Sequence, residues 1–273
     1  KIKKHSSARS GSIYAEKIND KLILLSANGK FQYFNITDFE KEEFSSKIIE
    51  SNIKTLIKYE DFYSNSNYGI KDLFYKNGFL YFSYNREVKE NCFNTSILRA
   101  KMNYEKLEFI KFFYPNDCIL KNNELGFTPH SAGGRMVSFN EKIVFSNGEY
   151  LDRLLAQDDE SIFGKILMLD PLNPGLYKTI SKGHRNVQGL WVDEKKNIVM
   201  STEHGPMGGD EVNINTSLGS EIKNFGWPIS SYGEHYGYKE RNDSHKIYKI
   251  APLHKSHKKY GFEEPIQYFV PSI

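Results

Sequence analysis

The stretch EKIVFS at residues 141–146 is followed by GKILMLD at residues 164–170, and the rest of the chain repeats this pairing of short apolar segments. Each segment is short, contains β-branched or aromatic residues and is bounded by turn-forming residues, so each predicts a β-strand. Three further pairs have the same pattern: KLILLS with KFQYFNI at 21–26 and 30–36, GFLYFSY with SILRAKM at 78–84 and 96–102, and KNIVMST with EVNIN at 196–202 and 211–215.

The first strand of each pair recurs at a regular interval. The four starts, at positions 21, 78, 141 and 196, are 57, 63 and 55 residues apart. An interval of this size fits a propeller blade of four strands with long loops, whereas the turns of a sandwich recur every ~8–12 residues. A helical solenoid would need apolar residues at 3.6-residue spacing, which these segments lack. The repeats favour an all-β propeller, and an all-β domain with coincidental spacing is the alternative.

One stretch departs from this strand pattern. The sequence TDFE at residues 37–40 matches a capping box, which is typical of a helix start. Apolar residues follow it at partly helical spacing: Phe44, Ile48, Ile49, Ile53, Leu56 and Ile57. The pattern predicts a short helix inserted between blades.

Length and composition set wider limits. A chain of 273 residues, 39% of them hydrophobic, can bury a sizeable core in one large domain or two small ones. An aromatic content of 14% suits stacked sheets. No segment approaches the ~20 apolar residues that a membrane helix needs, so we expect no transmembrane segment. A formal net charge of +3 is too small to indicate a nucleic-acid partner.

The two cysteines leave two interpretations open. Cys92 and Cys118 can form one disulfide in an oxidising compartment or remain as two buried thiols. Neither belongs to a CxxC or Cys/His cluster, so metal binding by them is not expected.

The sequence starts at Lys1 without an apolar signal segment, and this does not argue for the cytoplasm. Four histidines near the end lack a ligand spacing and predict a surface loop: His235, His245, His254 and His257.

Three dense motifs are expected on connections between strands, where a propeller builds its central site. They are HSAGGR at 130–135, GHRNVQGL at 183–190, and EHGPMGGDEVN at 203–213 with NFGWP at 224–228. In the third motif, glycines permit close backbone approach and Pro206 stiffens the turn. Backbone carbonyls and the carboxylates of Asp210 and Glu211 are the oxygen ligands that Ca²⁺ prefers. A glycine-rich turn with surface acids is the alternative reading of that motif.

The other two motifs carry nitrogen-based groups. Arg185 is followed by the amides of Asn186 and Gln188, a set that can hydrogen-bond a planar, anionic or carbonyl-rich ligand. Capping of loop carbonyls by Arg185 explains the same residues equally well. His130 can serve as a general base, and Glu149 could orient it, although a lone histidine is more often structural.

Taken together, in this order and spacing, the motifs resemble those of the PQQ-dependent glucose/sorbosone (aldose sugar) dehydrogenases. The match covers about residues 127–228, and the segment PIQYFVPSI at 265–273 also resembles the family. The resemblance implies one six-bladed β-propeller domain over residues 1–273 with the quinone over its central channel. About four to five blades are expected, because relatives continue through roughly one and a half more blades after the position of Ile273.

The resemblance also implies residue roles. His130 would remove the proton from the sugar C1 hydroxyl, Glu149 would be its acidic partner, and Arg185 would polarise the quinone carbonyl that accepts hydride. Cofactor contacts would come from these residues: Arg185, Asn186, Gln188, His204, Gly205 and Pro206. Calcium would be held by the carbonyls of Gly205 and Pro206, with Asp210 and Glu211 as an associated acidic pair.

Three positions depart from the family pattern. Arg135 follows His130 by one residue more than is usual, Glu149 replaces the common aspartate, and Val187 replaces the usual proline. A base displaced by ~1 Å can lose on the order of a hundredfold in rate, so the longer histidine loop bears directly on catalysis.

The sequence therefore predicts a periplasmic or secreted enzyme that needs PQQ and Ca²⁺. It would oxidise an aldose at C1 to the lactone and pass electrons to an external acceptor. A non-catalytic propeller of the same family that binds a ligand or protein is the first alternative. A calcium-dependent, lactonase-like propeller hydrolase is the second, although its acids and amides would have to converge from several blades.

Overall fold

The computed structural model describes residues 13–41, 45–57, 69–233 and 256–271. The chain divides into two compact units. The first comprises Lys1–Glu90 and Asn94–Asn116, and the second comprises Asn91–Phe93 and Asp117–Ile273.

The first unit contains two largely antiparallel sheets. The order of the first sheet is β1-β2-β3-β4-β8, and its short last strand runs parallel to β4. Its strands are β1 (Ile13–Ile18), β2 (Lys21–Ser26), β3 (Phe31–Asn35), β4 (Lys47–Ser51) and β8 (Lys106–Leu107). In the second sheet β5 (Ile70–Lys76) pairs with β6 (Phe79–Lys89), β6 with β7 (Cys92–Lys101), and β7 with β9 (Ile110–Phe113).

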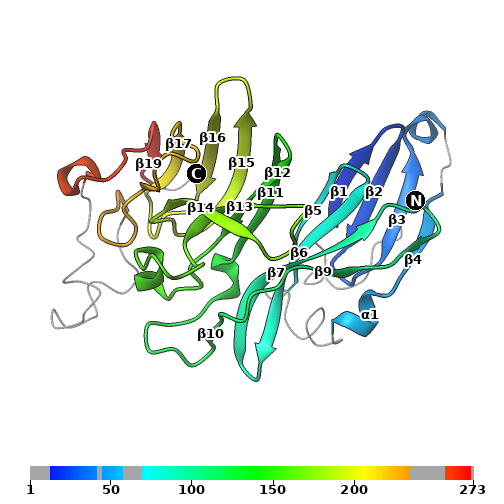
Figure 1. Cartoon of the computed structure of the whole chain (residues 1–273), viewed down its shortest axis with the longest axis horizontal. Helices are drawn as coiled ribbons and strands as arrows, with labels where there is room; N and C mark the ends of the chain where they lie inside the picture. The colour runs from blue at the N-terminus through cyan, green and yellow to red at the C-terminus, as the bar shows by residue number, and fades with distance from the viewer. Residues whose placement is uncertain (1–12, 42–44, 58–68, 234–255, 272–273) are drawn as a thin grey trace. The chain divides into compact units, whose positions relative to one another are not determined.

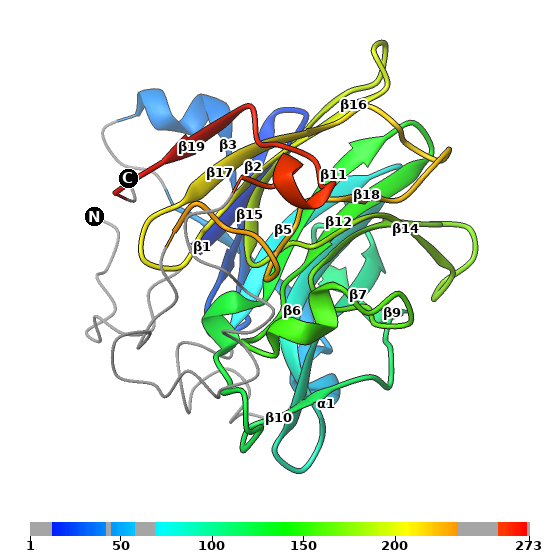
Figure 2. The same ribbon diagram turned by 90° about the vertical axis from the view of Figure 1, so that its left-hand side faces the viewer.

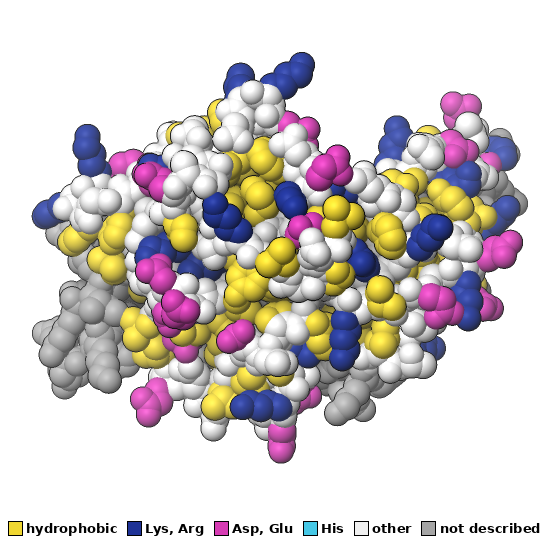
Figure 3. Space-filling model, in the orientation of Figure 1, with side chains coloured by type: hydrophobic (Ala, Val, Ile, Leu, Met, Phe, Trp, Pro, Cys, Tyr) yellow, Lys and Arg dark blue, Asp and Glu magenta, His cyan; other side chains and the backbone are white. Residues whose placement is uncertain are grey.

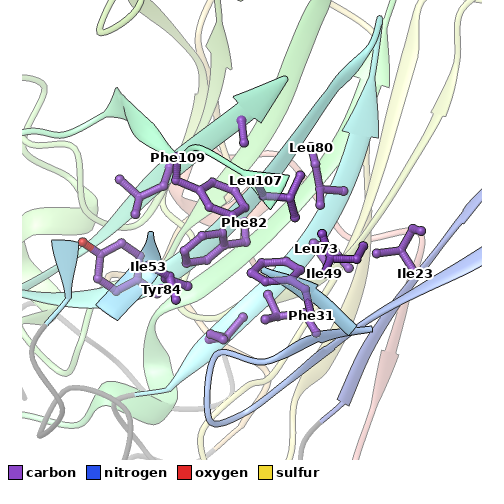
Figure 4. Close-up of a cluster of buried hydrophobic side chains, with 14 of the residues drawn as sticks. Ile23, Phe31, Ile49, Ile53, Leu73, Leu80, Phe82, Tyr84, Leu107 and Phe109 are labelled. Atoms are coloured by element: carbon purple, nitrogen blue, oxygen red, sulfur yellow. The ribbon is translucent and has the colours of Figure 1, made fainter. Parts of the chain in front are cut away.

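Apolar side chains from both sheets form the core of this unit. Phe31 and Phe82 lie at its centre beside Phe109, with the ring centroids of Phe31 and Phe109 5.2 Å apart (Figure 4). Ile49 and Leu80 pack into the same cluster and are almost completely buried. Truncating one of these phenylalanines to alanine would cost about 3–5 kcal/mol, because the cavity would refill only in part.

The second unit carries the motif-bearing loops on two further sheets (Figure 1). The order of the first is β11-β12-β13-β14-β18: β11 (Gly133–Phe139), β12 (Lys142–Asn147), β13 (Lys165–Leu169), β14 (Tyr177–Lys182) and β18 (Lys223–Asn224). The order of the second is β15-β16-β17-β19: β15 (Val187–Asp193), β16 (Ile198–Glu203), β17 (Asp210–Asn215) and β19 (Gln267–Phe269). Figure 2 shows β19 beside β17, although about fifty residues separate them in the chain.

The two sheets of this unit pack together through one apolar cluster. Val144 and Ile166 come from the first sheet, and Val187 and Val199 come from the second. All four are buried. The two sheets, in which β11 and β15 each begin at one of the motifs, therefore share one apolar cluster.

The repeats predicted from the sequence are confirmed strand by strand. The recurring first segments form β2, β6, β12 and β16, and each is the second strand of its sheet. The answering segments form β3, β7, β13 and β17, the third strand in each case. The interval of 55 to 63 residues is therefore the spacing of equivalent strands in successive sheets.

The predicted helix after residue 37 is largely wrong. A 3₁₀ turn, η1 (Ile36–Glu40), precedes the strand β4, and only α1 (Ile53–Leu56) is helical. Ile49 pairs with Phe31 across the sheet and is buried, whereas the neighbouring Ile48 is 72% exposed. That alternation is the period of a strand, and it suits two consecutive β-branched residues. Phe44 lies outside the described residues.

Two local features fix the connections. Asn77 and Gly78 both have positive φ in the turn between β5 and β6, as the mirror-image turns that are common in β-hairpins require.

Cys92 and Cys118 form a disulfide, which resolves the choice left open by the sequence. It ties the start of β7 to the segment before β10 (Ile119–Leu120), which pairs with the same strand end.

No helix within the described ranges is both long enough and apolar enough to cross a membrane. On the face shown in Figure 3, basic and acidic side chains are interspersed with apolar ones.

Candidate cofactor site

The backbone and the side chain of Arg185 are both hydrogen-bonded to the end of β16, at Glu203, its last residue, and at His204, which follows it. Its backbone N–H donates to Glu203 Oε2 at 2.7 Å, and its guanidinium Nη1 donates to the carbonyl oxygen of His204 at 3.0 Å. The guanidinium lies 5.7 Å from the centroid of the Trp227 ring, within the range of a cation–π contact. Arg185 is half-buried, so its charge is fixed in orientation and still accessible to a ligand.

Backbone hydrogen bonds tie the histidine motif to this arginine. Gly133 N–H donates to Asn186 Oδ1 at 3.1 Å, and Glu149 N–H donates to the carbonyl of Arg185 at 3.1 Å. The next amide, that of Tyr150, donates to Ser131 at 3.0 Å. The loop that carries His130 is therefore attached to the loop that carries Arg185 by direct bonds.

The glycine-rich motif forms a tight turn beside the arginine. A Cβ at Gly205 would lie 2.3 Å from the carbonyl oxygen of Gly209, so only glycine fits there. Gly209 itself has φ +70°. Asp210 closes the turn, because its Oδ1 accepts from Gly205 N–H at 2.9 Å and its Oδ2 lies 3.6 Å from His204 Nδ1. Gln188 Oε1 lies 3.2 Å from the Nε2 of the same histidine.

These groups surround a small pocket. It is lined by Arg185, Glu203, His204, Gly205, Gly209, Glu211, Phe225, Trp227, Ser230, Ser231 and His257. Arg185, His204 and Gly205, which the sequence assigned to one cofactor, thus face one space. His130 is exposed on η3 (Pro129–Ser131), and it is not among the residues that line this pocket.

Glu203 is the centre of a buried hydrogen-bond network that the sequence did not reveal. His184 Nδ1 lies 2.8 Å from Glu203 Oε1, and Asn213 Nδ2 donates to the same oxygen at 2.9 Å. Ser181 Oγ lies 2.8 Å from the other ring nitrogen of His184. With the Arg185 amide on Oε2, the carboxylate receives three donors inside the protein.

A second glutamate continues this network. Asn213 Nδ2 also donates to Glu211 Oε2 at 3.2 Å, and His257 Nε2 lies 2.8 Å from Glu211 Oε1. Ser230 Oγ bonds the remaining nitrogen of His257. The prediction of a surface loop for His257 is wrong: the residue is 1% exposed, because this carboxylate and hydroxyl enclose its ring. His235, His245 and His254 lie outside the described residues.

The pKa values of Glu203 and Glu211 are shifted in opposite directions. Burial alone would raise the pKa of Glu203, but the His184 ring and three hydrogen bonds outweigh it and hold that pKa below its ordinary value. Burial raises the pKa of Glu211 above its ordinary value, because its partners, chiefly His257, offset less of the cost and the Glu203 charge repels its own. Of the two, the carboxyl next to Arg185 is therefore the one that ionises more readily.

Glu149 is buried in a different way. It is completely buried, and neither carboxylate oxygen makes a hydrogen bond of good geometry among the described residues, although the Leu151 backbone interacts weakly with the carboxyl group. Burial therefore raises its pKa to about 7, although the charges of Arg185 and Arg153 act in the opposite direction. In this structure Glu149 makes no hydrogen bond to His130, and the expected orienting role remains a prediction.

The two carboxylates that the sequence assigned to calcium already have hydrogen-bond donors within the protein. Asp210 and Glu211 are already bonded to protein donors, as described above. Within the part of the chain that the structure describes, no group of three or more His, Cys, Asp or Glu side chains could hold a metal ion.

Comparison with known proteins places this chain in a family. The family model described as Glucose / Sorbosone dehydrogenase matches residues 64–273, more than half of the chain. The chain belongs to the glucose/sorbosone dehydrogenase family. The predicted family is therefore confirmed.

Relatives of this glucose/sorbosone dehydrogenase chain are longer than it is. It is 31% identical to the aldose sugar dehydrogenase YliI of Escherichia coli strain K12 over 159 residues, which are 53% of this chain and 39% of that protein. It is 26% identical over 227 residues to the uncharacterized protein slr1608 of Synechocystis, covering 73% of this chain and 49% of that protein. The chain spans less than half the length of either relative.

Solved structures show the same fold. The soluble aldose sugar dehydrogenase of Escherichia coli in its apo-form matches with a TM-score of 0.67 at 22% identity, covering 97% of this chain and 73% of that one. The PQQ-bound aldose sugar dehydrogenase of Streptomyces coelicolor matches with a TM-score of 0.57 at 18% identity, covering 94% and 68%. The predicted all-β, propeller-type fold is confirmed, and the described residues supply four sheets of it.

Proposed function

We propose that this chain is the greater part of one propeller domain of a PQQ- and calcium-dependent sugar dehydrogenase. The enzyme would oxidise an aldose at C1 to the lactone and pass the electrons to an external acceptor. Family membership and the names of the relatives support a sugar dehydrogenase. The Cys92–Cys118 disulfide supports a periplasmic or secreted location, since disulfides persist in oxidising compartments.

The groups around the pocket suit a planar, anionic quinone. Arg185 offers a fixed guanidinium, and Gln188 and His204 offer exposed polar atoms beside it. Trp227 provides an aromatic surface on the same pocket. For calcium, the carbonyl oxygens of Gly205 and Pro206 are suitable hard donors. The carboxylates of Asp210 and Glu211 fit less well as direct ligands, because internal donors already occupy them.

The side chains then divide the work. When bound, PQQ supplies the two-electron acceptor and calcium polarises its oxygens. Arg185 would orient that acceptor and stabilise charge developing on its carbonyl. His130 would take the proton of the C1 hydroxyl while the hydride leaves C1, so that the sugar becomes the lactone. A positioned base typically contributes ~10²–10⁴-fold in rate.

The observation that carries the proposal is the double anchoring of Arg185 beside the glycine-rich turn. Its test is titration of the chain with PQQ in calcium buffer, followed by quinone absorbance and tryptophan fluorescence. Wild type should bind saturably, and Arg185→Ala should bind about 10–100-fold more weakly, as expected for loss of a charge-assisted hydrogen bond.

A matched control is available in the first unit. Arg99 also lies over an aromatic ring, 5.1 Å from the centroid of Phe79, and has no place in the proposed site. Arg99→Ala should leave PQQ affinity unchanged. If Arg185→Ala bound PQQ as tightly as Arg99→Ala, the assignment of this pocket would be wrong.

One observation favours a second candidate, a non-catalytic binding module. His130 is exposed and is not among the residues that line the pocket shared by Arg185 and Gly205. Such a module would bind ligand without turning over sugar. PQQ-dependent dye reduction with aldoses separates the two: activity that falls at least a hundredfold in His130→Ala supports the dehydrogenase, and saturable PQQ binding without dye reduction supports the module.

A further inference from the structure

The connection between Arg185 and the end of β16 is reciprocal. The Arg185 backbone donates to the Glu203 side chain, and the Arg185 side chain donates to the His204 backbone. A third bond runs the other way, from His204 N–H to the carbonyl of Asn186 at 3.2 Å. Arg185 and Asn186 are thus hydrogen-bonded to two other consecutive residues, Glu203 and His204.

Apart from Arg185 itself, Glu203 contributes the one side chain to these three bonds, and it is itself immobilised. His184 fixes one carboxylate oxygen together with Asn213, and the His184 ring stacks on Phe225 with centroids 4.9 Å apart. His184 and Asn213 are 1% and 0% exposed, so water does not compete for their hydrogen bonds to Glu203. A buried carboxylate with satisfied oxygens is a stiff support for the amide that it accepts.

We infer that Glu203, held by His184 and Asn213, is the positioning residue that sets the orientation of the Arg185 guanidinium toward a planar anionic ligand. This inference rests on the proposed function. Glu203 needs no contact with the ligand to act, because the amide that it accepts is that of the arginine itself. Neither Glu203 nor His184 carries a role in the cofactor or metal set assigned above.

Three variants of the full chain test the inference. Glu203→Ala removes the acceptor from the Arg185 amide, whereas Glu203→Gln keeps one oxygen that can accept it. Asn215→Ala is the matched control: Asn215 is buried on β17, donates to Ile180 at 2.9 Å, and has no hydrogen bond to Arg185. This control measures the effect of losing a buried hydrogen bond elsewhere in the same sheet.

The primary readout does not use the cofactor. Amide hydrogen exchange at Arg185 should accelerate about 10–100-fold in Glu203→Ala, measured relative to global unfolding of the same variant. Glu203→Gln should restore most of the protection, and Asn215→Ala should leave it unchanged. Unchanged Arg185 exchange in Glu203→Ala would overturn the inference.

The second readout is PQQ affinity in calcium buffer. Glu203→Ala should weaken it at least about tenfold, since a misplaced binding group loses much of its contribution, with Glu203→Gln and Asn215→Ala close to wild type. If wild type failed to bind PQQ, the proposed function would fall, and the exchange data would still decide whether Glu203 positions Arg185. If wild type bound PQQ and Glu203→Ala bound it equally well, the positioning role would be rejected.

Discussion

Two buried glutamates in the second unit lie on either side of Arg185 and behave in opposite ways. Glu203 receives three donors and has a pKa held below its ordinary value. Glu149 is also buried, makes no hydrogen bond of good geometry among the described residues, and has a pKa raised to about 7. Burial is common to both, so the His184 ring and the hydrogen-bond donors around Glu203 account for the opposite directions of the two pKa shifts.

This difference separates a structural support from a group that can change its protonation. The Glu203 carboxyl has a lowered pKa and is fixed by its hydrogen bonds, which suits the positioning of a cation. Glu149 changes its charge near neutral pH. Its backbone N–H donates to Arg185, and the next amide, that of Tyr150, donates to Ser131 in the His130 loop. The pair thus shows how one site can hold a stable carboxylate and a titratable one.

The largest expected effect comes from removing the satisfied carboxylate. Glu203→Leu keeps about the same volume but removes the carboxylate that three donors share, so the free energy of unfolding should fall by about 3–5 kcal/mol. Urea denaturation at pH 7 measures this. Glu194→Leu, which removes an exposed acceptor of the Asn140 amide, should cost far less. Equal losses in both variants would contradict the comparison.

The next effect is a pH dependence of stability caused by Glu149. Its pKa rises from 4.5 in the unfolded chain to about 7 in the folded one, so the native state binds more protons between these values. Stability should therefore fall by up to about 3 kcal/mol as pH rises from 4.5 to above 7. Asp152, whose pKa burial also raises, acts in the same direction.

Glu149→Gln isolates that contribution. The variant keeps the shape without the charge, so it should lack this decline and exceed wild type in stability at pH 8. Chemical denaturation of both proteins at pH 5, 6, 7 and 8 gives the difference curve. A difference that stays constant with pH would show that Glu149 is ionised throughout.

The smallest effect is expected at an exposed ion pair. Lys182 and Asp159 are paired at 2.5 Å, but the Asp159 side chain is 69% exposed. Asp159→Asn should change the free energy of unfolding by about 1 kcal/mol or less, because water and salt screen such pairs. A loss of stability in Asp159→Asn as large as that in Glu203→Leu would mean that burial does not explain the difference between Asp159 and Glu203.

The sequence predicted the strands well, because their patterns are local. Each recurring segment, such as residues 141–146, contains its own alternation and turn signals. The helix after residue 37 was mispredicted because Ile48 and Ile49 fit both periods, and only pairing with Phe31 selects the strand.

The candidate site was predictable only in part. The motifs identified Arg185, His204 and Gly205, which the fold does bring to one pocket. The supporting network joins residues that are distant in sequence: Glu203 accepts from an amide 18 residues away, and Glu211 bonds His257 46 residues away. No local pattern encodes such contacts.

The account depends on one planar cofactor being held between the Arg185 guanidinium and the glycine-rich turn. A crystal structure of the chain with PQQ and Ca²⁺ tests this most directly. We predict quinone oxygens within hydrogen-bonding distance of Arg185 and a calcium ion on the carbonyls of Gly205 and Pro206. PQQ bound elsewhere, with Arg185 directed only at the His204 carbonyl, would contradict the account.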